Sequence, residues 1–162
     1  MDNFNQNQKG FTLIELVMVI VLLGILSYGA TGLFASKSTY TEFIAKEQLI
    51  AQALLAQQIA FGMSATNNPV SLRISRSAGG ETSFSLTKTG QTPLTEILDS
   101  SLNSPLVDGA TLANGSSVTF TWNSQASLAD NTNHSVAFVG TKTYRVCFSA
   151  SGYVYESTVA CP

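Results

Sequence analysis

The chain has 162 residues, a formal net charge of −2 at pH 7 and only 11% charged residues. This charge balance disfavours a nucleic-acid receptor, which needs a basic surface to complement the phosphate backbone. A single histidine, His134, disfavours enzymes built on Ser-His-Asp or Cys-His groups, and the sequence has neither a Cys/His zinc spacing nor a phosphate-binding glycine motif. We therefore expect a protein that is not an enzyme, with no catalytic residues, no cofactor and no metal.

The N-terminus combines a short polar leader with a long apolar run. The leader covers residues 1–10, and the run that follows it contains one acid, Glu15, at its start. Residues 16–36 contain no Asp, Glu, Lys or Arg, and about 20 residues with a rise of about 1.5 Å each suffice to cross a bilayer. We expect a transmembrane helix, also the core of a filament, over residues 11–35.

An ordinary secretory signal, cleaved within Ser27–Ala30, is the alternative interpretation of this segment. It fits less well, because the apolar run exceeds the usual length of about 7–15 residues and Glu15 lies inside it. A carboxylate at such a position is costly unless it is paired, neutralised or brought to the lipid headgroups. Glu15 is therefore a candidate functional residue.

The segment Gly10–Glu15, with the sequence GFTLIE, resembles the prepilin motif of type IV pilins and of the pseudopilins of type II secretion. The resemblance implies cleavage between Gly10 and Phe11 by a prepilin peptidase, N-methylation of Phe11 and assembly of the mature chain into a helical filament. Within the family, residues 15–26 are similar to pilins of the mannose-sensitive haemagglutinin class. The resemblance is confined to the N-terminal part of the chain.

Cleavage would place a new amino group at Phe11, about one helical turn from Glu15. We expect the Glu15 carboxylate of an incoming subunit to pair with the Phe11 amine of its neighbour during filament assembly. The alternative is a glutamate that only reaches out to the headgroups.

The helix is expected to continue through an amphipathic half over residues 36–62 and to stop at Gly62, giving a rod of about 75 Å from Phe11 to Phe61. Its apolar stripe is expected to lie against a globular head. The residues of this stripe are Phe43, Ile44, Ile50, Ala51, Leu54, Leu55, Ile59 and Phe61. In the apolar half, the glycines between Gly24 and Gly32 indicate either local melting in the filament or close helix packing.

Residues 63–162 are predicted to form a single head domain, because they contain segments with the alternation typical of strands. These segments are residues 70–74, 83–87, 118–122, 136–139, 143–148 and 153–158, joined by short turns at 78–81 and 150–152. A short helix is expected over 94–102, and a surface loop over 103–117. The expected fold is α+β, with the long helix packed on an antiparallel sheet in a ladle shape.

The two cysteines, Cys147 and Cys161, could close a loop that ties the C-terminal tail to the sheet, and an exported protein would keep such a bond. The resemblance to pilins implies the same disulfide. A free or intermolecular thiol is the alternative.

Three further groups of residues suggest possible ligands in the head. His134 lies in the polar segment 129–135 and is expected on a surface loop. In that segment Asp130, Asn131 and Asn133 carry oxygen ligands for calcium, without the glycine and terminal glutamate of an EF-hand. A possible sugar site would use the aromatic residues Trp122, Tyr144, Tyr153 and Tyr155, which in strands are more often core or cross-strand partners.

The expected function is that of a minor structural subunit of a type IV pilus that serves surface adhesion or motility. The alternatives are a type II secretion pseudopilin and a sugar-binding or DNA-binding minor pilin, the last weakened because Arg73 and Arg76 form only a short basic pair. Expected partners are other pilin subunits, the prepilin peptidase and methyltransferase, the pilus assembly platform and the membrane, but no nucleic acid. The chain is expected to cross the bacterial inner membrane once, with its head in the periplasm, and then to enter an extracellular pilus or a periplasmic pseudopilus.

Overall fold

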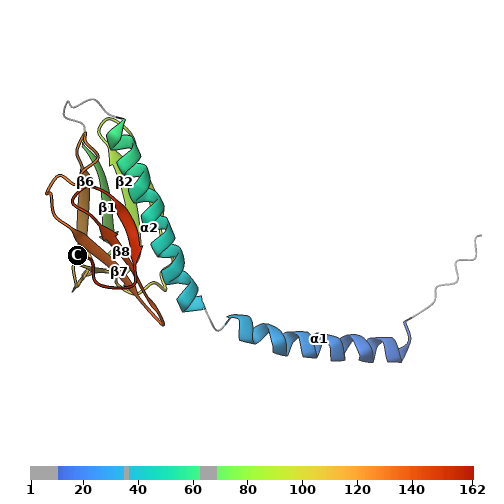
Figure 1. Ribbon diagram of the computed structural model, residues 1–162. Helices are drawn as coiled ribbons and strands as arrows, with labels where there is room; N and C mark the ends of the chain where they lie inside the picture. Colours follow the sequence, from blue (N-terminus) through green and yellow to red (C-terminus); the bar gives the residue numbers. More distant parts are fainter. Residues whose placement is uncertain (1–10, 35–36, 63–68) are drawn as a thin grey trace, which may run out of the picture. The chain divides into compact units, whose positions relative to one another are not determined.

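The computed structural model describes residues 11–34, 37–62 and 69–162 (Figure 1). Contacts divide the chain into two units, Met1–Lys37 and Ser38–Pro162, and each unit is described by itself. The described residues form two α-helices and two antiparallel β-sheets, which confirms the expected α+β class. The leader, residues 1–10, and its junction with Phe11 lie outside the described residues.

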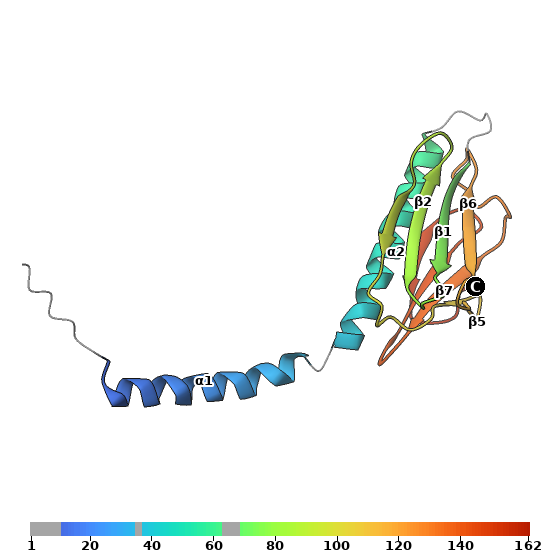
Figure 2. The same ribbon diagram turned by 180° about the vertical axis from the view of Figure 1, so that it is seen from behind.

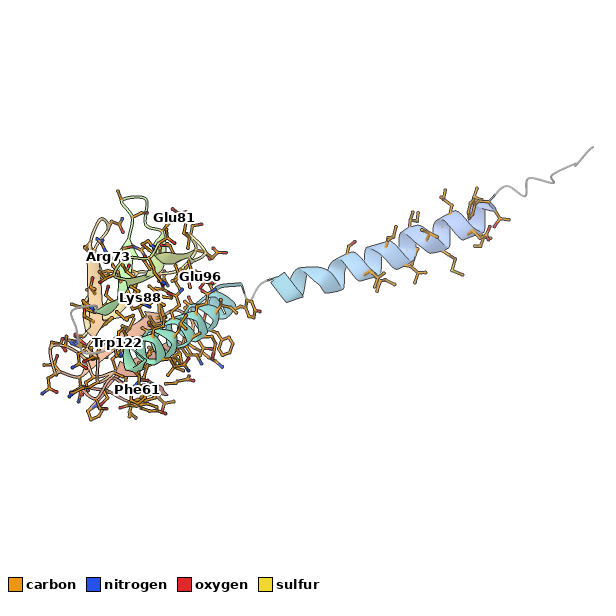
Figure 3. The ribbon with its side chains drawn as sticks, turned by 90° about the horizontal axis from the view of Figure 1, so that it is seen from above. Phe61, Arg73, Glu81, Lys88, Glu96 and Trp122 are labelled. Atoms are coloured by element: carbon orange, nitrogen blue, oxygen red, sulfur yellow. A yellow bond between two sulfur atoms is a disulfide. The ribbon has the colours of Figure 1, made fainter. Side chains whose placement is uncertain are left out.

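The first unit contains helix α1 (Leu13–Phe34). The described side chains from Leu13 to Ser27 are exposed, and Figure 3 shows them extending from the helix axis on opposite sides. Within the described ranges, no helix reaches the combination of length and apolarity that a membrane crossing requires. The membrane span expected over residues 11–35 is thus not shown and stays a prediction.

The second unit begins with helix α2 (Lys37–Phe61), which lies along the sheets in both views (Figures 1 and 2). The helix ends where the sequence predicted, since the Gly62 amide donates to the Gln58 carbonyl at 3.2 Å. Its buried face, however, is not the predicted one. The residues that it buries are Thr41, Glu42, Ala45, Lys46, Leu49, Gln52, Ala53, Ala56 and Ala60.

Several large apolar side chains of α2 stay exposed instead. Phe43, Leu55 and Phe61 are 39%, 37% and 77% exposed, and Ala51 is exposed as well. The prediction that this stripe lies against the head holds for Ile50 and Ile59, which pack against the core, and is wrong for Ala51, Leu55 and Phe61. The physical reason is that the small alanines let the helix approach the sheets closely, while three polar side chains, Lys46, Gln48 and Gln52, find partners on the edge strands. Lys46 pairs with Glu156, and Glu96 accepts hydrogen bonds from Gln48 and Gln52.

The first sheet has the strand order β3-β2-β1-β6 and is antiparallel throughout. Figure 2 shows β2, β1 and β6 side by side. The strands are β1 (Val70–Arg76), β2 (Thr82–Lys88), β3 (Leu94–Ile97) and β6 (Ser117–Trp122). In the central strands, apolar side chains face inward and alternate with more exposed residues, as predicted; Thr82 is the one threonine of these strands that is fully buried.

The second sheet has the order β5-β4-β7-β8-β9 and is also antiparallel. Its strands are β4 (Leu106–Val107), β5 (Ala110–Thr111), β7 (His134–Val139), β8 (Thr143–Phe148) and β9 (Val154–Ser157). The inward faces of both sheets and the buried face of α2 form a shared hydrophobic core. Its largest fully buried side chains include Trp122, Phe84, Phe138 and Phe148.

Three expectations for the head need correction. A helix over 94–102 was expected, but residues Leu94–Ile97 form β3, because they pair with β2 along its free edge. The segment 103–117 is more than a surface loop, since it contains the β4–β5 hairpin and buries Val107 and Leu112. Where a single sheet was expected there are two, because β6 adds to β1 while β7, β8 and β9 pair among themselves and with β4.

Candidate functional site

The N-terminal end of α1 is built by three reciprocal hydrogen bonds between Thr12 and Glu15. The Thr12 amide and hydroxyl donate to Glu15 Oε2 at 2.9 and 3.0 Å, and the Glu15 amide donates to the Thr12 hydroxyl at 3.3 Å. This is a capping box, in which the side chains of the N-cap and N3 residues satisfy backbone amides that lack helical partners. It explains why the helix begins at Leu13.

Phe11 lies just before this cap, outside the helix, and is 92% exposed. Of the two predicted cleavage residues, Phe11 is therefore described and Gly10 is not. Because the helix begins after Thr12, Phe11 lies outside it, and its exposure makes it accessible to a peptidase. Glu15 lies one turn further along the same exposed helix end.

Thr12 is a residue that sequence reasoning missed at this site. The signal was present, because Thr12 and Glu15 stand at the T-x-x-E spacing of a capping box directly before an apolar run. Glu15 therefore has a local role, in capping its own helix, in addition to the intersubunit role predicted for it.

In the head, Cys147 and Cys161 form the expected disulfide, with a Cα–Cα distance of 5.6 Å. Cys147 lies on β8, so the bond ties the residues that follow β9 to the sheet. A hydrogen bond of 2.8 Å from Asn133 Nδ2 to the Pro162 carbonyl oxygen fixes the last residue as well. The C-terminal tail is thereby held at two points.

His134 is not the loop residue that the sequence predicted, but the first residue of β7. Its Nδ1 lies 2.7 Å from Asp108 Oδ2, and its Nε2 lies 2.6 Å from Asp130 Oδ2. Both ring nitrogens can donate to carboxylates only when the ring is protonated. Desolvation by itself lowers the pKa of His134, but the hydrogen bonds to Asp108 and Asp130 outweigh it and raise the pKa above its ordinary value.

Two of the residues that were considered as calcium ligands, Asp130 and Asn133, make hydrogen bonds within the head instead. Desolvation by itself raises the pKa of Asp130, but the hydrogen bond with His134 outweighs it, and the pKa is lowered. Asn133 Oδ1 accepts the Ala150 amide at 2.7 Å. Among the described residues, no group of three or more His, Cys, Asp or Glu side chains is arranged to hold a metal ion.

The aromatic residues considered for a sugar site do not share one surface. Trp122 is fully buried and donates to the Gly152 carbonyl at 3.2 Å, whereas Tyr144 packs edge-on against Phe43 of α2. Tyr153 and Tyr155 stack with their ring centroids 5.8 Å apart. The burial of Trp122 agrees with the core role that the sequence favoured for aromatic residues in strands.

The two arginines that were considered for nucleic-acid binding lie on opposite faces of β1. Arg73 and Arg76 lie three positions apart on β1, and alternate side chains of a strand point to opposite faces. Arg73 is exposed, while Arg76 donates to Asn114 Oδ1 at 2.7 Å. The pair does not form a joint basic patch.

Comparison with known proteins gives one match, at the N-terminus. Residues 5–31 match the family model of the prokaryotic N-terminal methylation motif. No curated protein and no solved structure is similar enough to the chain to match it. The match confirms the resemblance to type IV pilins and pseudopilins at the segment that carries Gly10, Phe11 and Glu15, and it supports a type IV pilin-like or pseudopilin precursor.

Proposed function

We propose that this chain is the precursor of a minor structural subunit of a type IV pilus that serves adhesion or motility. The observation that carries the proposal is the methylation motif at residues 5–31, followed by a capped helix whose described side chains are exposed on all sides. In this proposal a prepilin peptidase cleaves the peptide bond between Gly10 and Phe11, and the Phe11 amine is then N-methylated.

Cleavage converts the Thr12–Glu15 cap into an assembly site. Both hydrogen bonds from Thr12 end on Glu15 Oε2, and no described residue donates to Oε1. The carboxylate can therefore keep its cap and still receive the Phe11 amine of a neighbouring subunit through Oε1. In a nearly water-free helix bundle such a charge pair contributes strongly, because each ion is costly to bury alone.

The outward face of α2 supports assembly through the helices. Phe43, Leu55 and Phe61 remain exposed, Phe43 with one edge against Tyr144, while Glu42, Lys46 and Gln52 of the same helix are buried against the head. Exposing large apolar side chains while burying polar ones is unfavourable for an isolated head and favourable when a further apolar surface covers the helix. In a filament that surface would be the helices of neighbouring subunits.

The proposal places the precursor in the bacterial inner membrane as a single-pass protein with the head in the periplasm. Partners would be the prepilin peptidase and methyltransferase, the assembly platform and other pilin subunits. The disulfide between Cys147 and Cys161 suits an oxidising compartment of this kind. A type II secretion pseudopilin, which shares the same motif and the same assembly helix, is the alternative.

The test is substitution of Glu15. The variant Glu15→Val should still reach the membrane and be cleaved, but its incorporation into sheared filaments should fall by about 100-fold or more, because losing one partner of a buried ion pair costs about 3–5 kcal/mol. Glu81→Val, at an exposed glutamate in the turn between β1 and β2, is the matched control and should assemble normally. Normal incorporation of Glu15→Val, measured by quantitative mass spectrometry of the filaments, would refute the assembly role.

A further inference from the structure

The outer face of the second sheet carries a pocket of about 240 Å³ beneath the C-terminal tail. It lies on the side of the sheet opposite to α2. Val146 is buried in the core and its cross-strand partner Glu156 binds Lys46 of α2, so this position of the sheet faces α2, and Arg145, one position earlier, faces the other side. The lining residues are Leu106, Gly109, Ser135, Ala137, Arg145, Ala160 and Cys161. One of them, Arg145, is charged, and none is acidic.

Arg145 has no counter-ion within the part of the chain that the structure describes. Its cross-strand neighbours are Ala137 on β7 and Ser157 on β9, both small and uncharged. The nearest acid in sequence to the pocket lining, Asp108, already uses one oxygen for His134 and the other for the Ser135 amide. A partly buried guanidinium that lacks an anion is poorly compensated, so the pocket attracts negative charge.

The tail forms one wall of this pocket, and the disulfide holds the tail in place. Ala160 and Cys161 line the pocket, and Cys161 is bonded to Cys147 of β8. Val159 just before them is fixed by its amide, which donates to the Ser157 hydroxyl at 3.2 Å. The pocket therefore depends on the oxidised state of the head.

We propose that this pocket is a binding site for a small carboxylate, which Arg145 holds under the disulfide-anchored tail. A guanidinium offers a planar pair of N–H donors that matches the two oxygens of a carboxylate. Ser135 adds a hydroxyl, and Leu106 and Ala137 add an apolar wall for the remainder of the ligand. With about 30 Å³ per water, the pocket has room for about eight waters, which is enough for a sugar acid or an acylated amino acid.

The test uses the full-length oxidised chain, labelled with ¹⁵N and held in detergent micelles. Glucuronate and N-acetylglycine serve as two carboxylate sources, and glucose and N-acetylglycinamide serve as their neutral counterparts at the same ionic strength. We expect saturable amide shifts at Ala137, Ser157 and Cys161 with a carboxylate and none with its neutral counterpart. The carboxylate that binds more tightly identifies the source.

Variants separate the site from general charge effects. Arg145→Gln should weaken binding by at least about tenfold, because the charge-assisted hydrogen bonds are lost. Arg73→Gln, at an exposed arginine on the other sheet, should bind as the wild type does. Reduction of the disulfide should also weaken binding, because the wall formed by Ala160 and Cys161 is released.

Three results would overturn the proposal. They are an absence of saturable shifts with both carboxylates, equal shifts with the neutral counterparts, and equal losses for Arg145→Gln and Arg73→Gln. The comparison of carboxylates with neutral counterparts uses only the wild-type chain, so it decides the matter even if Arg145→Gln fails to fold. Filament assembly through Glu15 is tested separately and does not depend on this result.

Discussion

Gly152, in the turn between β8 and β9, is constrained by its backbone and by its neighbours. Its φ is +83°, a left-handed conformation that disfavours residues with a Cβ. A Cβ built at this position would collide with the backbone carbonyl of Ala126 and lie 3.1 Å from Trp122 Cδ1. The Gly152 carbonyl also accepts the indole N–H of Trp122. One residue thus joins a tight turn to the largest side chain of the core.

The variant Gly152→Ala should lower the free energy of unfolding of the head by more than about 2 kcal/mol, because strain in φ and a backbone collision act together. Gly115→Ala is the matched control, since Gly115 has a φ of +77° and no atom within 4 Å of the added Cβ. It should cost only about 1–2 kcal/mol. Denaturant titration followed by Trp122 fluorescence measures both values, and equal costs would contradict the packing argument.

At the scale of elements, the bridge from Asp108 through His134 to Asp130 joins three segments of the head. Asp108 lies in the turn between β4 and β5, His134 begins β7, and Asp130 belongs to the connection before it. Asp108 also accepts the Ser135 amide at 2.7 Å. The short β4–β5 hairpin, which has only two residues in each strand, is therefore anchored mainly by this bridge and by its pairing with β7.

This bridge makes the stability of the head depend on pH. Because the pKa of His134 is raised on folding, the bridge stabilises the head fully below the unfolded pKa of about 6.5 and loses this effect as the pH rises through the folded value. Because the pKa of Asp130 is lowered on folding, the contribution of Asp130 to the stability of the head is present above its unfolded pKa of about 3.9. This contribution disappears as the pH falls through the folded pKa. Urea unfolding should thus show a loss of stability as the pH rises above about 6.5. His134→Gln should flatten this profile, and an unchanged slope would exclude the bridge as its cause.

The buried face of α2 shows how tertiary contacts overrule a local pattern. The sequence of this helix offers a large apolar stripe and a polar stripe, and burial of the apolar one is the usual outcome. Here Lys46 of the polar stripe is buried, at 2.8 Å from Glu156, and its ammonium group lies 4.6 Å from the ring centroid of Phe43. Desolvation alone lowers the pKa of Lys46, but the hydrogen bonds to Glu156 and Glu47 raise it, so the ion stays charged in its buried position.

At the scale of the whole molecule, each of the two units exposes apolar surface that favours association. The described residues of α1 expose apolar side chains on all sides, and α2 exposes Tyr40, Phe43, Leu55 and Phe61. Exposed apolar area of this extent favours association with other apolar surfaces. Each unit thus supports, by itself, a role in assembly.

The proposed role as a minor subunit predicts copy number. Quantitative mass spectrometry of sheared surface filaments should find this chain at a small fraction of the most abundant subunit. An excess over all other subunits would instead identify a major pilin. Absence from surface fibres, together with impaired protein secretion when the gene is deleted, would favour the pseudopilin alternative.

The sequence by itself determined the features that depend on neighbouring residues. The methylation motif at residues 5–31, the end of α2 at Gly62 and the alternation of β1, β2 and β6 each depend on a few neighbouring positions. Helix capping and side-chain periodicity are local effects. The two cysteines also limited the disulfide to one intramolecular pairing, Cys147 with Cys161.

Only the tertiary structure decided which face of α2 is buried, that residues 94–97 form a strand, and that His134 lies between two aspartates. The same holds for Arg145: that none of the residues described here supplies its counter-ion depends on the register of β7, β8 and β9 and on the path of the tail. Each of these features joins groups that are distant along the chain, such as Lys46 with Glu156 or Asp108 with His134. The physical reason is that a polar group can be buried wherever a partner compensates its desolvation, and local sequence does not specify that partner.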